Sequence, residues 1–272
     1  GVVAVGFRLD GVSLGADDST APYSISWDTT SAADGPHTLT AESRDAANNI
    51  GTSSVAVTVS NSQVTSNPFY ADLDGVDDYA QVADSDGLSF GNGGSDTPLT
   101  LEAWFRADGL LVKQNLIGKG VDNSNLEYRL YFAANSIRLD LRDRSAQATV
   151  SAAMTGSQAA LAGNWHHLAV TYDGRGGPTA AAGIIFYMDG AVVPITRFNS
   201  SAYVAMENTT APLLIGREGP NFKQYNGTID EVRIWNVARS QGQIQSQMAF
   251  ELAGTEPGLA AYWKFNEGSG TS

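Results

Sequence analysis

The sequence predicts an all-β protein with two β-sandwich modules, over residues 1–61 and 62–272. Most hydrophobic residues alternate with polar ones at a period of two, which is the pattern of half-buried strands. Asp-Gly and other Gly-rich turns separate these runs at short intervals. A length of 272 residues suits one large β domain together with a smaller one.

The first module is expected to be a short antiparallel structure. Asp10-Gly11 and Asp34-Gly35 are hairpin dipeptides, because both residue types tolerate a positive φ. The polar stretch Ser62–Pro68 predicts a linker to the second module. The strand-like runs of the first module place hydrophobic residues at alternate positions: Val3, Val5 and Phe7, then Leu39 and Ala41, then Val55, Val57 and Val59.

The second module is expected to contain many strands and a single helix. The helix is indicated by Ile244, Met248 and Leu252 at a spacing of four, preceded by Ser240 and Gln243 in the spacing of a capping box. One short helix among so many strands predicts a β-sandwich. The alternating hydrophobic positions include Leu99, Leu101, Ala103, Phe105, Leu130, Phe132, Ile137, Leu139, Leu141, Leu168, Val170, Tyr172, Ile184, Phe186, Met188, Val232 and Ile234.

Composition excludes several classes of function. The net charge of −13 argues against nucleic acid and anionic membranes as partners, because both require clustered Lys and Arg. Without cysteine the chain has neither disulfides nor thiolate metal sites. No run of 18 apolar residues is present, so no membrane insertion is expected. The excess of carboxylates suits solubility in salt or a bound cation.

The sequence does not predict an enzyme. His166 and His167 are adjacent in a strand pattern, so their side chains should point to opposite faces of a sheet. No nucleophile elbow, zinc-protease helix or Walker loop is present. Asp230 and Glu231 are also consecutive, and their side chains are expected to diverge rather than form the carboxylate pair of a glycosidase.

The first module resembles bacterial immunoglobulin-like domains of secreted multidomain proteins. The resemblance covers only the later part of such a domain, and about two earlier strands of the family are missing. It therefore implies a partial sandwich with an unpaired sheet edge. The segments that carry the resemblance are Phe7-Arg8-Leu9-Asp10-Gly11, Ala21-Pro22-Tyr23, Trp27-Asp28, Gly35–Ala41 and Asp45–Ser53.

The second module resembles the laminin-G-like, concanavalin-type jelly-roll family over nearly its whole length. This resemblance implies a jelly-roll β-sandwich and an extracellular or cell-surface location, although the fold also occurs in glycosidases. The closing segment 262–270 is also similar to the opening of such a domain, so a further module is expected after it. The matching segments are Leu73-Asp74-Gly75-Val76-Asp77-Asp78-Tyr79, Leu101-Glu102-Ala103-Trp104-Phe105, Trp165–Ala169, Tyr187–Gly190 and Gly227–Asn236.

An acidic turn is a candidate Ca²⁺ site. Asp74, Asp77 and Asp78 bracket the turn at Gly75, and Ca²⁺ binds six to eight oxygen ligands. By the family resemblance, Asp230 could complete the site. The alternative is that these aspartates only cap the turn with their carboxylates.

A loop of aromatic and polar residues between two apolar strands is the candidate glycan site. Its predicted ligand-binding residues are Arg217, Asn221, Phe222 and Tyr225, since sugars stack on aromatic rings and bond to polar groups. Phe198 and Tyr203 are further candidates on loops. The tryptophans at 104, 165, 235 and 263 lie within strand patterns and are expected to pack against the sheets.

Three functions remain open at this point. The first is a carbohydrate-binding or adhesion module of a larger secreted or surface protein, whose partner is a glycan or polysaccharide. The second is a structural spacer or fibre subunit in which other copies of the chain donate a strand to the open immunoglobulin-like edge. The third is a glycoside hydrolase.

Overall fold

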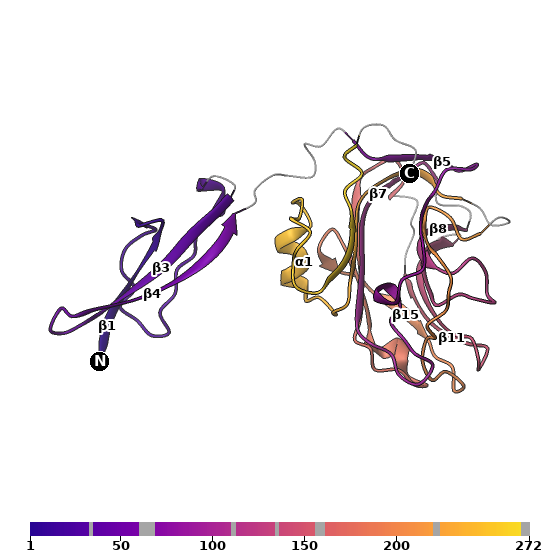
Figure 1. The fold of residues 1–272 in the computed structure, drawn as a ribbon, viewed down its shortest axis with the longest axis horizontal. Coiled ribbons are helices and arrows are strands. Elements are labelled where there is room, and N and C mark those ends of the chain that lie inside the picture. The colour runs from indigo at the N-terminus through magenta and orange to yellow at the C-terminus, as the bar shows by residue number, and fades with distance from the viewer. Residues whose placement is uncertain are drawn as a thin grey trace. The chain divides into compact units, whose positions relative to one another are not determined.

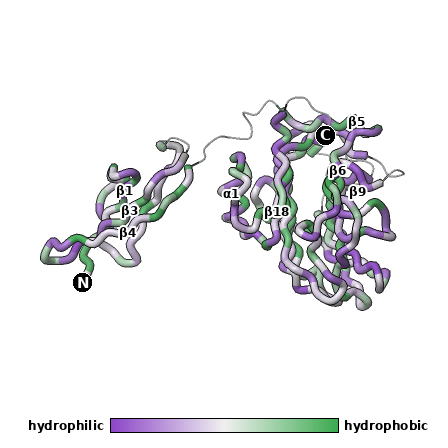
Figure 2. The backbone as a smooth tube through the Cα atoms, viewed as in Figure 1, coloured by the Kyte–Doolittle hydropathy of each residue, from purple (hydrophilic) through white to green (hydrophobic). Residues whose placement is uncertain are grey.

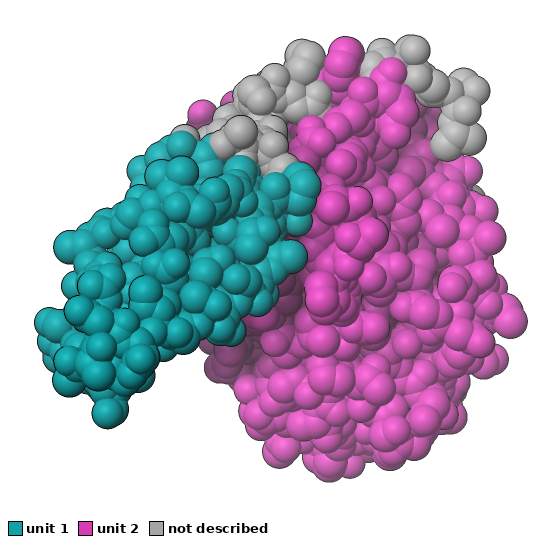
Figure 3. Space-filling model, turned by 60° about the vertical axis from the view of Figure 1, so that its left-hand side comes forward, with its two compact units in different colours: residues 1–63 teal, residues 64–272 magenta. Residues whose placement is uncertain are grey.

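The computed structural model describes residues 1–32, 35–59, 69–109, 113–133, 136–155, 161–219 and 224–267. The chain divides into two compact units, Gly1–Gln63 and Val64–Ser272, coloured separately in Figure 3. The predicted linker and Asp34 of the second predicted hairpin lie outside the described residues.

Unit 1 contains one four-stranded antiparallel sheet in the order β2-β1-β3-β4 (Figure 1). Asp10 and Gly11 join the first two strands with φ angles of 49° and 84°, as the hairpin dipeptide predicted. A 3₁₀ turn, η1 (Thr29–Ser31), lies between the second and third strands. The strands are β1 (Val2–Leu9), β2 (Val12–Ser13), β3 (Gly35–Asp45) and β4 (Ile50–Val59).

Unit 1 buries little hydrophobic surface within its described residues. Val5 and Val59 are its only buried hydrophobic residues there, whereas Val55 is 56% exposed. Strand β4 pairs with β3 without a bulge and has no partner on its other edge among the described residues. The described part of unit 1 is therefore a single sheet.

Unit 2 is a sandwich of two antiparallel sheets that face each other (Figure 1). The β7 sheet has the order β14-β13-β12-β7-β17-β18, with β5 also paired to β17. The β9 sheet has the order β15-β11-β10-β9-β8-β16-β6. The strands are β5 (Ala71–Asp74), β6 (Ala80–Val82), β7 (Leu99–Ala107), β8 (Gln114–Lys119), β9 (Tyr128–Ala133), β10 (Ser136–Asp143), β11 (Ala148–Met154), β12 (His166–Tyr172), β13 (Ile184–Met188), β14 (Ala191–Val192), β15 (Ile195–Phe198), β16 (Leu213–Ile215), β17 (Asn226–Trp235) and β18 (Leu259–Trp263).

The core of unit 2 lies between the two sheets. Alternate residues of each central strand point inward and are completely buried, because a strand turns successive side chains to opposite faces. Figure 2 shows the hydrophobic stretches along these facing strands. The predicted core positions confirmed here include Leu99, Leu101, Phe105, Leu130, Phe132, Ile137, Leu139, Leu141, Leu168, Val170, Tyr172, Phe186, Val232 and Ile234.

Helix α1 (Gln241–Gln247) packs outside the β7 sheet (Figure 1). The predicted capping box is present, because Ser240 Oγ accepts from Gln243 N and Gln243 Oε1 accepts from Ser240 N. Ile244 is buried against Ala169 of β12 and Tyr187 of β13. Within the described residues, no helix has the length and apolar character needed to cross a lipid bilayer.

Strand β17 lies in the β7 sheet, between β7 on one side and the two strands β5 and β18 on the other. It pairs with β7 along one edge, and on its other edge β5 pairs with Asn226–Ile229 while β18 pairs with Val232–Trp235. Gly227 has a φ of 138°, and a Cβ there would lie 2.2 Å from the Arg106 carbonyl oxygen. Glycine therefore permits the close approach of β17 to β7.

Candidate functional site

A cleft of about 1150 Å³ lies between two groups of strands in unit 2. One wall comes from residues 69–73 and 259–267, which include β5 and β18 on the same edge of β17, and the other comes from residues 79–82, which include β6. β6 and β18 are the terminal strands of the two sheets. Ile215, Ala253 and Gly254 complete the lining.

Aromatic rings line both walls of this cleft. Phe69, Tyr70 and Tyr79 are 43%, 40% and 38% exposed, which is high for residues of their size. β18 and the segment after it contribute Tyr262, Trp263 and Phe265, which are half-buried. Exposed rings that gather in one concavity are the usual sign of a ligand site.

Two arginines contact aromatic rings of the cleft. The guanidinium of Arg217 lies 4.4 Å from the centre of the Tyr79 ring, and Asn115 Nδ2 donates to the Arg217 carbonyl oxygen at 2.7 Å. Arg106 lies 5.7 Å from the Tyr70 ring, which also meets Trp165 edge-on. Cation–π contacts of this kind orient the ring faces before any ligand arrives.

Polar groups are placed among the rings. Gln81 lies on β6, and Asp72, Lys264, Asn266 and Glu267 lie on the wall of β5 and β18. Glu251 fixes two of them, because Lys264 Nζ lies 3.4 Å from Glu251 Oε2 and Asn266 Nδ2 donates to Glu251 Oε1 at 2.8 Å. The cleft thus combines ring faces with hydrogen-bonding groups.

The predicted glycan loop is only partly represented in this site. Arg217 lies beside the cleft through its contact with Tyr79. Asn221 and Phe222 lie outside the described residues. The prediction for Tyr225 is wrong, because its side chain is completely buried against Phe132 in the sandwich core.

The other aromatic candidates also differ from expectation. Tyr203 is buried and donates its hydroxyl to Asp96 at 2.9 Å, so it belongs to the core. Phe198 is exposed but lies against Arg138, away from the cleft lining. Among the tryptophans, Trp235 is buried as predicted, and Trp263 packs against the core as predicted while also lining the cleft.

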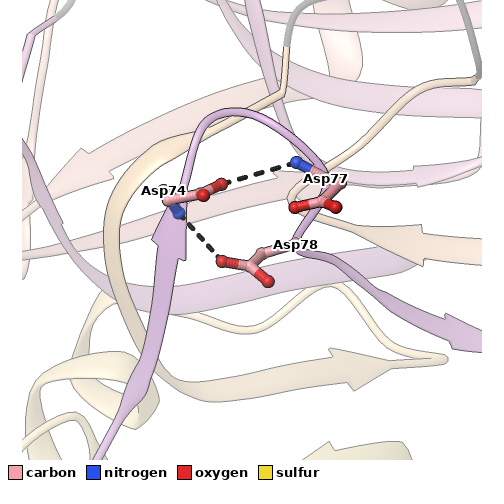
Figure 4. A group of neighbouring side chains, drawn as sticks. All are labelled: Asp74, Asp77 and Asp78. Carbon is pink, nitrogen blue, oxygen red and sulfur yellow. Dashed lines mark hydrogen bonds between the residues drawn. The ribbon is translucent and has the colours of Figure 1, made fainter.

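The acidic turn precedes Tyr79 directly. Asp74, Asp77 and Asp78 are exposed, and a carboxylate oxygen of each lies within 4.8 Å of the others (Figure 4). Asp74 Oδ1 accepts from Val76 N at 2.7 Å, and Asp78 Oδ2 accepts from Asp74 N at 3.2 Å. The carboxylates therefore cap the turn while leaving other oxygen lone pairs for a cation.

Asp230 does not belong to this group. Asp74 is paired with Asn226, and Asp230 lies four residues further along β17, which is about 13 Å in an extended strand. The predicted fourth ligand is therefore wrong, because the register of β5 on β17 separates Asp230 from the turn.

A bulge in β17 overturns the expectation that Asp230 and Glu231 diverge. The register shifts between Asp230 and Arg233, and Glu231 has a φ of 50°. Ile229 and Val232 face the core, and both carboxylates between them lie outside it, although each is buried. Glu231 accepts from Arg233 at 2.5 Å and from the Tyr262 hydroxyl.

Under α1, the outer face of the β7 sheet carries a buried cluster of charged residues. Glu102 bonds to Arg239 at 2.7 Å, and Arg233 donates to the carbonyl oxygens of Gln247 and Phe250. Burial, followed by the charges of Arg233 and Arg239, lowers the pKa of His167 to about 3, so this ring is neutral at pH 7. His166 bonds instead to Asp189. His166 pairs with Phe105 and His167 pairs with Trp104, so the two histidine side chains lie on opposite faces of the sheet, as predicted.

The cleft residues that the sequence analysis missed come from two distant segments. Phe69, Tyr70 and Tyr79 precede or follow the acidic turn, and Trp263 and Phe265 lie near the end of the chain. No spacing in the sequence links these segments. The only available signal was their shared richness in aromatic residues.

Comparisons with known proteins support this fold. The family model described as the concanavalin A-like lectin/glucanases superfamily matches residues 73–245, and the bacterial Ig domain model matches residues 1–41. A Bacteroides ovatus ATCC 8483 protein proposed to bind carbohydrate has a TM-score of 0.52 at 15% identity, over 98% of this chain and 72% of that chain. At this identity the likeness shows the fold alone.

Two other solved structures are less similar. Domains LG4-5 of the mouse laminin α1 chain give a TM-score of 0.42 at 15% identity, over 68% of this chain and 43% of that chain. The binding domain of Paraclostridial Mosquitocidal Protein 1 gives 0.45 at 12% identity, over 61% and 39%. With TM-scores below 0.5, neither carries an argument. No curated protein sequence matches the chain.

The buried position of Asp230 predicts a pH-dependent stability. Desolvation, followed by the charge of Glu231, raises the pKa of Asp230 to about 7. Between about pH 4 and 7 the folded state then holds a proton that the unfolded chain releases, so stability falls as the pH rises through this range. Asp230→Asn should reduce the fall in unfolding free energy between pH 5 and 8 by a few kcal/mol, measured by urea unfolding. The exposed control Asp72→Asn should keep the wild-type slope, and parallel curves for wild type and Asp230→Asn would contradict this assignment.

Proposed function

Because the chain belongs to the concanavalin A-like lectin/glucanase superfamily over residues 73–245, we propose that it is a non-catalytic carbohydrate-binding module of an extracellular or cell-surface protein. The observation that carries this proposal is the aromatic cleft. Its rings offer flat apolar faces for sugar rings, and its amide and charged groups offer hydrogen bonds to hydroxyls.

The position of the acidic residues supports binding without hydrolysis. The adjacent pair Asp230 and Glu231 is buried and does not line the cleft. Asp72 and Glu267 do line it, but both are exposed to water. A glycosidase instead keeps its acid in an apolar surrounding, close to a second carboxylate across the scissile bond.

A glycan array followed by calorimetry tests the proposal. Tyr70→Ala and Tyr79→Ala should each weaken saccharide binding about tenfold, since one aromatic contact contributes about 1 kcal/mol or more. The control Phe198→Ala removes an exposed ring outside the cleft and should bind as wild type. No reducing ends should appear during incubation with the bound saccharide. Unchanged affinity in both tyrosine variants, or turnover of the glycan, would contradict the proposal.

The acidic turn is proposed as a structural Ca²⁺ site. Three neighbouring carboxylates match the oxygen ligands that Ca²⁺ prefers, with carbonyl oxygens or water needed to reach six to eight. Because the turn leads directly into Tyr79, a bound ion would also fix one ring of the cleft. Asp74, Asp77 and Asp78 would hold the ion.

Calcium should then raise the stability of the protein. At free Ca²⁺ about 100 times Kd the gain is about 2.7 kcal/mol, read as a higher melting temperature than in chelator. Asp77→Asn and Asp78→Asn should lose this gain, whereas Asp230→Asn should retain it. A melting temperature equal in Ca²⁺ and in chelator would exclude the site.

An alternative role as a strand-accepting structural subunit is favoured by β4. This strand is ten residues long, has no charged residue or proline, and offers an unpaired edge among the described residues. Monomeric proteins usually protect such an edge with charges, prolines or bulges. A strand from another copy of the chain could pair there by β-augmentation.

Light scattering over a concentration series distinguishes this role. Assembly through β4 should increase the average mass with concentration, and Val55→Lys should abolish the increase by placing a charge on the exposed strand. Val204→Lys places the same charge on an exposed position outside the strands and should leave assembly unchanged. A constant monomer mass at all concentrations would rule the alternative out.

A further inference from the structure

The lining of the cleft restricts which saccharide fits it. We propose that the cleft binds a neutral polysaccharide chain through three or more consecutive sugars, rather than a single sugar or an acidic glycan. This inference rests on the proposed function and adds the class of ligand. It follows from the size of the cleft, the distribution of its rings and its charge.

The size of the cleft exceeds that of a pocket for one sugar. Its volume of about 1150 Å³ lies above the range of about 300–1000 Å³ that is typical of pockets for small-molecule ligands. The five residues of β18 alone give one wall a length of about 16 Å. A monosaccharide would leave most of this surface in contact with water.

The rings are spread over both walls instead of clustering at one point. Phe69 and Tyr70 lie where the chain enters β5, and Tyr79 lies beyond the acidic turn, next to β6. Trp263 and Phe265 lie further along the same edge as β5, whereas the Tyr262 hydroxyl bonds to Glu231. Because each ring face stacks on about one sugar, three exposed rings favour a ligand of at least three residues.

The charge of the lining disfavours acidic sugars. Asp72 and Glu267 are lining carboxylates, and Lys264, the one cation among the described lining residues, is paired with Glu251. The acidic turn lies directly after β5, in a chain of net charge −13. A uronate or sulfate group in this cleft would meet like charges, which weakens binding.

Neutral amide groups lie on both walls. Gln81 lies on β6, and Asn266 lies beyond β18 on the opposite wall, where its Nδ2 donates to Glu251 Oε1. Amides both donate and accept hydrogen bonds, as sugar hydroxyls do. A neutral chain between the walls can therefore bond to both sides while its ring faces stack on the aromatic side chains.

Calorimetry with defined saccharides tests the inference. The probes are monomers, trimers and hexamers of β-1,4-glucan, β-1,4-xylan and β-1,4-mannan, with polygalacturonate and alginate as acidic polymers. For at least one neutral series, affinity should rise about tenfold or more from monomer to trimer. The acidic polymers should not bind. Raising the salt from about 50 to 500 mM should leave the neutral affinity unchanged, because no charge is bound.

The outcomes separate this inference from the proposed function. Equal affinity for monomer and hexamer, or tighter binding of an acidic polymer, would overturn the inference while the module remained a carbohydrate binder. Absence of binding to every saccharide would overturn the proposed function and the inference with it.

Two variants locate the effect in the cleft. Tyr79→Ala should reduce the increase in affinity from monomer to trimer at least fivefold. Tyr79→Phe keeps the ring and should preserve that increase. Circular dichroism and the melting temperature of each variant check that the fold is intact. If affinity depended on saccharide length identically in wild type and Tyr79→Ala, the saccharide would bind outside the cleft and the inference would be overturned.

Discussion

The hydrogen-bonded ladder along β17 is the interaction on which the rest of unit 2 depends. One edge of this strand pairs with β7, and the other edge is shared by two short strands from opposite ends of the unit, β5 and β18. Backbone donors and acceptors of a central strand must be paired when they are buried. The shared edge therefore fixes β5 and β18, which together line one wall of the aromatic cleft, relative to each other, although they are distant in sequence.

The bulge in β17 falls where β5 ends and β18 begins, and it explains why this outer face is charged. Two carboxylates and an arginine, Asp230, Glu231 and Arg233, emerge there on a face that α1 and the segment after it cover. Arg233 offsets Glu231 directly and bonds to two backbone carbonyls of the cover. Removing one partner of such an ion pair would leave a buried charge unpaired. This would destabilise the fold by more than the intact pair stabilises it. The cluster thus binds α1 and the segment after it to the β7 sheet.

Much of the fold could be predicted from sequence because it depends on local patterns. A period of two identified the core positions of β7, β9, β10 and β12, and the capping box located the start of α1. The site could not be predicted in the same way. Tyr225 was assigned to a loop, but it directly precedes β17 and turns into the core, and Asp230 was joined to a turn from which strand register separates it. Register and bulges are set by long-range pairing, so no local pattern reveals which aromatic residues meet.

The arrangement of β5 and β18 also determines how unit 2 would respond to tension. Both strands run antiparallel to β17, so the start of β5 at Ala71 and the end of β18 at Trp263 lie next to each other near the bulge. Among the ladder bonds of β5 and β18, those at Ile229 and Val232 would therefore be the first to bear a force on the two ends of the unit. Strands loaded in this peeling direction separate at lower force than strands loaded in shear, because few hydrogen bonds carry the load at once. The ends of the unit would extend early, while the inner strands of both sheets stayed paired.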